Sequence, residues 1–350
     1  MKLRIRDVLV PLSTGLVLTS GTLLSGCEPA ATKSFQAGFR GTGMVQVKNP
    51  HRTAAQAAIN AVPAALPRPP VTPDTPLAGA TLKNVQVLKD VPVPEFTRLM
   101  VAVTAWVAPQ QGCAYCHEAA DFSSDALYTK QVARRMFEMT RHINTDWHQH
   151  VANTGVTCFT CHRGHNVPAA IWYKNPGPEH ASFYAGWKDG QNAPAESVRL
   201  ASLPNDPFST YLETPREIRV IGESALRQDG MGSSIKTTEQ TYGLMMHFTQ
   251  SLGVNCTYCH NSRSFFSWDQ STPQRATAWY GIRLVRDLNY HYLDPLGSIF
   301  PPVRHGVTGD APKLNCATCH QGAFKPLNGV SMLPDYPELK GPVKVAAQQQ

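Results

Sequence analysis

The pattern Cys-x-x-Cys-His occurs four times in this chain of 350 residues, beginning at positions 113, 158, 256 and 316. It is the attachment site of a c-type haem, because its two thiols bond to the porphyrin vinyl groups and the adjacent histidine becomes the proximal iron ligand. A single Cys-x-x-Cys could instead be a redox pair or half of a zinc site. Four copies that all end in histidine and use eight of the nine cysteines predict four covalently bound haems.

The pattern assigns a role to each of its cysteines and histidines. The predicted attachment residues are Cys113, Cys116, Cys158, Cys161, Cys256, Cys259, Cys316 and Cys319, and the predicted proximal iron ligands are His117, His162, His260 and His320. No cysteine pair is then left for a disulfide. Because each porphyrin is a large apolar plate, we expect a mainly α-helical fold with long irregular segments and a haem-packed core. The formal charge of +7 does not indicate a nucleic-acid surface, because haem propionates offset it.

The N-terminus has the layout of a secretory signal. Lys2, Arg4 and Arg6 precede an apolar run over residues 8–24, and the tetrapeptide that ends at Cys27 resembles a bacterial lipobox. We therefore predict removal of residues 1–26, lipidation of Cys27 and anchorage at the periplasmic face of a membrane. An uncleaved signal anchor and simple secretion are the alternatives. No internal stretch is long and apolar enough to span a bilayer.

The remaining chain divides into five predicted segments. These are a proline-rich N-terminal arm (27–94), a half with haems 1 and 2 (95–167), a connector (168–236), a half with haems 3 and 4 (237–322) and an irregular tail (323–350). The prolines of the arm favour extended chain, turns and short edge strands, with a short helical turn at 54–58.

Apolar residues at helical spacing predict a helix before each motif or motif loop. The predicted ranges are 95–109, 125–150, 238–252 and 274–293. The first and third helices share a Leu-Met pair, at Leu99-Met100 and Leu244-Met245, and the second and fourth align around residues 140–144 and 285–289. This internal repeat predicts two pseudo-symmetric dihaem halves.

A haem that only carries electrons has both axial positions filled. For haem 1, Met100 is the only methionine between positions 44 and 113. For haem 3 the candidates are Met245 and Met246, and the shared Leu-Met pair favours Met245. For haem 2 the candidates Met136 and Met139 lie one helical turn apart, so spacing does not separate them.

Haem 4 has no comparable methionine, because none lies between Met246 and Met332. Under the alignment of the two long helices, Met136 falls opposite Gly281. A histidine is therefore the expected distal ligand. The candidates are His291, His305, His142, His148 and His150.

Several segments resemble the tetrahaem cytochrome subunit of the purple-bacterial photosynthetic reaction centre. The resemblance is carried by residues 135–141 (RMFEMTR), 147–151 (WHQHV), 154–158 (TGVTC), 106–110 (WVAPQ) and 252–256 (LGVNC), and it covers roughly 77–322. It implies Met136 as the ligand of haem 2 and His150 as the ligand of haem 4. It also implies Met100 and Met245 for haems 1 and 3.

The same resemblance implies a function. The chain would re-reduce the photo-oxidised bacteriochlorophyll special pair and would itself be reduced by a small cytochrome c or a high-potential iron–sulfur protein. Haem 3 would lie nearest the special pair. Because four distal ligands can be named for four haems, we expect an electron carrier and no enzyme. The alternatives are a membrane-anchored multihaem carrier of a respiratory chain and a multihaem reductase with one open iron.

Overall fold

The computed structural model describes residues 32–36, 44–175, 195–220 and 235–341. The signal segment and Cys27 lie outside the described residues, as does much of the predicted connector. Helices and irregular segments make up almost all of the described chain, in agreement with the predicted fold class.

The N-terminal arm contains a hairpin and a helix. Strands β1 (Lys33–Gln36) and β2 (Val45–Lys48) pair antiparallel, with Lys33 opposite Lys48. Helix α2 (Pro50–Ile59) follows and is longer than the short helical turn predicted at 54–58. The Asn49 side chain caps it by accepting hydrogen bonds from two backbone amides, and Pro50 occupies the first turn, where its missing N–H costs nothing.

The predicted motif-associated helices are all present, with boundaries shifted by a few residues. They are α4 (Val93–Val107), α5 (Tyr128–Asp146), α8 (Ile235–Leu252) and α9 (Pro273–Leu288). The predicted helix 125–150 breaks at Trp147 and resumes as α6 (His148–Val151). The predicted helix 274–293 continues after α9 as the π-helical turn η5 (Asn289–Leu293).

The remaining elements are short. Those that carry the motifs are η1 (Gly112–Tyr115), α7 (Cys158–His162), η4 (Cys256–Tyr258) and α10 (Cys316–His320). The others are α3 (Ala78–Thr81), η2 (Glu196–Val198), η3 (Ser209–Glu213), η6 (Asp294–Ser298), η7 (Pro302–Arg304), η8 (Pro326–Gly329), η9 (Leu333–Asp335) and η10 (Pro337–Leu339).

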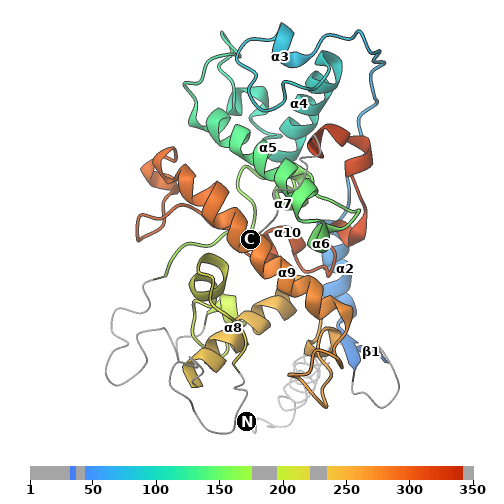
Figure 1. Ribbon diagram of the computed structural model, residues 1–350, viewed down its shortest axis with the longest axis vertical. Coiled ribbons are helices and arrows are strands. Elements are labelled where there is room, and N and C mark those ends of the chain that lie inside the picture. Colours follow the sequence, from blue (N-terminus) through green and yellow to red (C-terminus); the bar gives the residue numbers. More distant parts are fainter. Residues whose placement is uncertain (1–31, 37–43, 176–194, 221–234, 342–350) are drawn as a thin grey trace, which may run out of the picture.

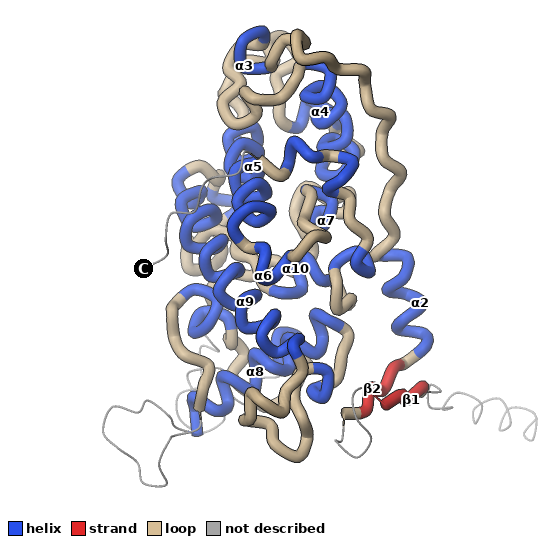
Figure 2. The backbone as a smooth tube through the Cα atoms, turned by 45° about the vertical axis from the view of Figure 1, so that its right-hand side comes forward, coloured by secondary structure: helices blue, strands red, loops and turns tan. Residues whose placement is uncertain are grey.

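The body is elongated, and the first helix pair, α4 and α5, lies toward the end opposite to α8. Figure 1 shows α4 and α5 at one end, α8 at the other, and α9 crossing between them. The short motif helices α7 and α10 lie near the middle (Figure 2). The β1–β2 hairpin lies at the α8 end in both views.

Two segments without a haem motif are part of the core. The C-terminal residues Leu327, Tyr336 and Leu339 are buried in one cluster with Leu99 and Trp106 of α4. Burial of such side chains contributes about 1.5–3 kcal/mol each, so this tail anchors the first half.

The second of these segments belongs to the predicted connector. Its residues Tyr211 and Leu212 are fully buried and pack with Leu244 of α8 and Ile282 of α9. The described part of the connector therefore helps to form the core of the second half.

A polar network joins α5 of the first half to α9 of the second. Both ring nitrogens of His142 lie 2.6 Å from a carboxylate oxygen, Nδ1 from Asp146 and Nε2 from Asp287. The Trp147 indole donates to the same Asp287 oxygen at 2.9 Å, and His291 lies 3.7 Å from the other. The hydrogen bond to Asp287 is the largest cause of a raised His142 pKa, and it outweighs the lowering by burial.

This network predicts a pH-dependent contribution to stability. Because the folded pKa of His142 is raised above 6.5, the contribution is complete below that pH and is lost as pH rises through the folded value. His142→Gln should therefore lower the free energy of unfolding by about 2 kcal/mol at acidic pH and by less at alkaline pH. Urea denaturation followed by circular dichroism at several pH values measures the difference in unfolding free energy between the wild type and the variant. His148→Gln, at an exposed position, is the control. A difference that does not become smaller as pH rises would contradict the role given to His142.

Candidate haem-binding sites

All four motif histidines are oriented by a backbone carbonyl. The Nδ1 atoms lie 2.9 Å from Phe122 O for His117, 2.9 Å from His165 O for His162, 2.8 Å from Phe265 O for His260 and 2.9 Å from Ala323 O for His320. Donation from Nδ1 fixes the tautomer and leaves Nε2 free to bind a metal, which is the usual arrangement around metal-ligating histidine. Burial also lowers the pKa of His162, His260 and His320, the last to about 4, so these rings are neutral at pH 7.

One large cavity connects the first two motifs. It has a volume of about 580 Å³ and is lined mainly by apolar side chains of α4, α5 and the residues around them. Met100 and Met136 lie on its wall together with His117 and His162. Such size and apolar lining are typical of cofactor sites, so the residues present fit porphyrin. Met139 also lines this cavity, so the structure does not separate it from Met136 as a ligand.

Threonines follow the candidate methionines by four residues, a signal that the sequence analysis missed. The Thr104 hydroxyl donates to the carbonyl of Met100 at 2.8 Å, and Thr140 donates to that of Met136 at 2.8 Å. Each bond fixes the threonine side chain on the cavity wall, beside the turn that carries the methionine. The same spacing places Thr249 after Met245, but the Thr249 hydroxyl donates to the carbonyl of Met246 at 2.9 Å.

The distal candidate for haem 4 lies opposite its proximal histidine. The rings of His150 and His320 have centroids 6.0 Å apart. His150 donates through Nδ1 to Thr277 O at 2.9 Å, so its Nε2 is free. Metal–imidazole bonds are about 2 Å long, so this spacing accommodates one metal ion between the two rings. Burial lowers the pKa of His150, which keeps it in the neutral, metal-binding form.

Gly281 makes room for this arrangement. A Cβ at position 281 would lie 2.6 Å from Cε1 of His150. The aligned position in the first half is Met136. A glycine on α9 therefore stands where a local methionine would be expected, and the imidazole of His150 fills the space.

The other candidate histidines are engaged elsewhere or exposed. Both ring nitrogens of His142 contact carboxylates, and Nε2 of His305 lies 2.9 Å from Gly297 O. The His291 side chain is 60% exposed and lies beside Asp287, and His148 is exposed. Among the five predicted candidates, the structure brings His150 alone into ring contact with His320.

The N-terminal hairpin contacts the third motif. The Gln46 side chain donates to the Thr257 hydroxyl at 3.0 Å and accepts from the backbone N–H of Asn255 at 3.1 Å. The Thr257 hydroxyl donates to Val45 O at 2.6 Å. Met245, the ligand predicted for haem 3, packs against the cluster that contains Leu244. The arm is thus tied to the segment that carries Cys256, Cys259 and His260.

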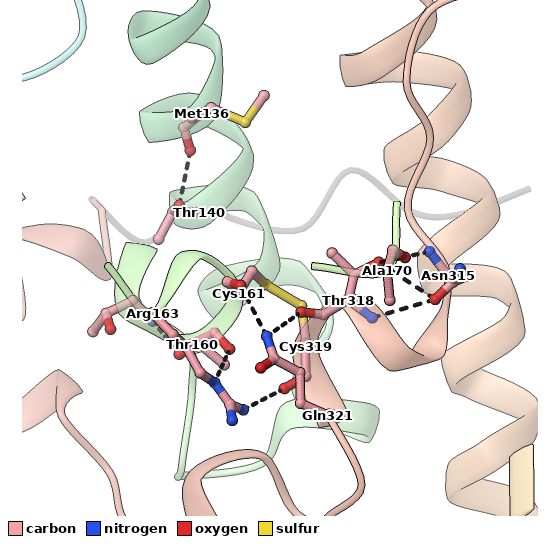
Figure 3. The surroundings of a disulfide bond; sticks show 11 residues. Met136, Thr140, Thr160, Cys161, Arg163, Ala170, Asn315, Thr318, Cys319 and Gln321 are labelled. Carbon is pink, nitrogen blue, oxygen red and sulfur yellow. Dashed lines mark hydrogen bonds between the residues drawn. A yellow bond between two sulfur atoms is a disulfide. The ribbon is translucent and has the colours of Figure 1, made fainter. Parts of the chain in front are cut away.

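One prediction about the cysteines is wrong. Cys161 and Cys319 form a disulfide, with their Cα atoms 4.3 Å apart, although the motif pattern predicts that no cysteine pair is left for one. The reason is tertiary: α7 and α10 pack against each other and bring the last cysteines of the second and fourth motifs together (Figure 3). The free cysteines in the described residues are Cys113, Cys116, Cys158, Cys256, Cys259 and Cys316. A sulfur in this disulfide cannot also be a haem thioether, so the two bonds are alternatives.

The described residues include no helix with the length and apolar character needed to cross a bilayer.

Comparison with known proteins agrees with this haem-site geometry. The family model described as photosynthetic reaction centre cytochrome C subunit matches residues 28–340. Three proteins with the name photosynthetic reaction center cytochrome c subunit are similar over most of their length. The one from Rubrivivax gelatinosus is 50% identical over 95% of this chain and 90% of its own. The relative from Thermochromatium tepidum is 47% identical over 93% of this chain and 79% of its own. The relative from Roseobacter denitrificans is 42% identical over 92% of this chain and 90% of its own.

These matches confirm the resemblance seen in the sequence and do not favour the respiratory-carrier alternative. The chain belongs to the family of photosynthetic reaction centre cytochrome c subunits, which carry covalently bound haem and serve in photosynthetic electron transfer.

Proposed function

We propose that this chain binds four c-type haems and re-reduces the photo-oxidised special pair held by the membrane subunits of a reaction centre. The observation that carries the proposal is the opposed pair His150 and His320, since it supplies a second ligand for the one haem that lacks a methionine. With both axial positions filled at every iron, the bound haems would offer no open position for a substrate. Each haem, when bound, supplies a one-electron couple between ferric and ferrous iron.

The proposed ligand set rests on the motifs, on the cavity wall that carries Met100 and Met136, and on the family resemblance, which favours Met136 over Met139 and supports Met245. The eight motif cysteines would form the thioethers, Cys161 and Cys319 once their disulfide is opened. The motif histidines His117, His162, His260 and His320 would bind iron on the proximal side. Met100, Met136 and Met245 are the distal ligands of haems 1, 2 and 3, and His150 is that of haem 4.

We further propose that the two halves are pseudo-symmetric. Motifs 1 and 3 share a 3-10 turn and a proximal histidine stacked on a phenylalanine, with ring centroids 4.9 Å apart for His117–Phe122 and 5.2 Å for His260–Phe265. Motifs 2 and 4 share an α-helical turn with a capping box at its start and a left-handed residue at its end. The shared local geometry supports a common origin of the two dihaem units.

The hairpin suggests how the body is oriented. Cys27 precedes Lys33 by six residues, which reach at most about 20 Å, and the hairpin is bonded to the third motif. Lipidation of Cys27 would therefore hold haem 3 toward the periplasmic face of the membrane and toward the special pair. The opposite end, with the haem 1 segment, would face a soluble donor such as a small cytochrome c or a high-potential iron–sulfur protein.

Mass spectrometry and absorbance spectroscopy test the haem number and the ligand set. The intact protein should carry four covalent haems and a lipid on Cys27, and a ferric spectrum should show only six-coordinate, low-spin iron. Fewer than four haems, or binding of carbon monoxide to the ferrous protein without denaturant, would contradict the closed set of ligands.

A further inference from the structure

Helices α7 and α10 are held together by reciprocal hydrogen bonds around the Cys161–Cys319 pair. The Arg163 guanidinium donates to Cys319 O at 2.9 Å, and the Gln321 side chain donates to Cys161 O at 3.1 Å (Figure 3). Arg163 and Gln321 occupy the same left-handed position after their helices, with φ of 48° and 43°. Each motif therefore supplies the side chain that binds the backbone of the other.

The start of each helix is fixed as well. The backbone N–H of Thr157 donates to the Thr160 hydroxyl at 2.9 Å, and the backbone N–H of Asn315 donates to the Thr318 hydroxyl at 3.0 Å. These capping bonds are made entirely by side chains and backbone of the two motifs. Hydrogen bonds within and between α7 and α10 therefore hold the two cysteines close together.

We propose that Cys161 and Cys319 form a disulfide in the chain before haems 2 and 4 are attached, and that a dithiol reductant must open it for either attachment to be completed. The proposal rests on the proposed function, because it takes both motifs to be haem sites. It assigns a thiol–disulfide exchange site that links the assembly of two haems, one from each half.

The chemistry balances at each step. Two thiols lose two electrons and two protons to a disulfide oxidant of the secretory compartment, which becomes a dithiol. A dithiol reductant later returns two electrons and two protons, is itself oxidised to a disulfide, and leaves Cys161 and Cys319 as thiols. Each S–H then adds across a haem vinyl group, with sulfur bonded to one carbon and hydrogen to the other.

The corresponding cysteines of motifs 1 and 3 provide an internal comparison. Cys116 and Cys259 occupy the same motif position as Cys161 and Cys319, yet both are free thiols. Attachment of haems 1 and 3 therefore does not require this reduction. The structure thus predicts two classes of haem site. Motifs 1 and 3 can accept haem directly, whereas motifs 2 and 4 both require reduction of the same disulfide first.

Alkylation of the full-length haem-free chain tests the disulfide directly. The chain is produced in cells depleted of haem, treated with iodoacetamide, digested without reduction and analysed by mass spectrometry. The expected result is a cross-linked peptide joining Cys161 to Cys319, with Cys116 and Cys259 alkylated. Alkylation of all four, or a Cys158–Cys161 bond within the second motif, would overturn the proposal.

A second experiment uses folded, partly loaded protein from haem-limited cells. Molecules with two haems should carry them at motifs 1 and 3 and retain the Cys161–Cys319 bond. Haem restored to the cells together with dithiothreitol should convert them to the four-haem form, whereas haem alone should not. Cys319→Ala should remove the need for reductant at motif 2, whereas the matched variant Cys259→Ala should not. Equal loading of all motifs without reductant would overturn the proposal. Failure to reach four haems with both haem and reductant in excess would instead contradict the proposed function.

Discussion

His150→Met is expected to raise the reduction potential of one haem and leave the other three nearly unchanged. A Met/His pair stabilises ferrous iron more than a His/His pair does. The change should be on the order of 0.1 V, well within the roughly 0.8 V range that axial ligands cover. A redox titration of the haem α-band, resolved into four waves, measures it.

The control for this variant is His148→Met, which makes the same substitution two residues away at an exposed position. It should leave all four waves in place. His150→Ala should in addition open one iron to carbon monoxide, because no other candidate histidine has a ring next to His320. Four unchanged waves in His150→Met would show that this residue does not bind iron.

Gly281→Ala should disturb the same haem without changing any ligand. The added Cβ would lie 2.6 Å from Cε1 of His150, so the imidazole has to move. Overpacking of this kind costs about 1–3 kcal/mol, and the displaced ring should bind iron more weakly. We expect a fraction of one haem to become high-spin and the midpoint of that haem to shift, as measured by absorbance and redox titration.

Gly297→Ala is the matched control, because the nearest atom to its added Cβ lies 3.9 Å away, at ordinary contact distance. It should keep the wild-type spectrum. A Gly281→Ala protein with an unaltered spectrum and four unaltered potentials would place the His150 ring away from haem 4.

Sequence patterns within a short stretch of chain predicted the features that short-range interactions determine, above all the helices. Helical periodicity found α4, α5, α8 and α9 to within a few residues. The attachment cysteines and proximal histidines that motif spacing predicts stay predictions. Helix α2 was underestimated although its start carries two signals, Asn49 as a cap and Pro50 in the first turn. Those signals lay within a proline-rich arm and were outweighed by its composition.

Contacts between distant segments were harder to predict. Spacing alone left five histidine candidates for haem 4, and the family resemblance pointed to His150. The packing of α6 against α9 is what brings the His150 ring to His320. The glycine at position 281 was a clue, because its missing side chain is what admits the ring. Burial of Tyr336 and Tyr211 and the meeting of Cys161 with Cys319 also depend on tertiary packing, which composition and periodicity do not encode.

The most direct test of the proposed function is the flash-induced absorbance change of the haem α-band in membranes that contain this protein. With the haems reduced beforehand, the account predicts rapid haem oxidation in step with re-reduction of the special pair. The same signal should be lost when the chain is removed and should return when it is restored. A special pair that recovers at the same rate with no haem oxidation would contradict the role of this chain as the electron donor.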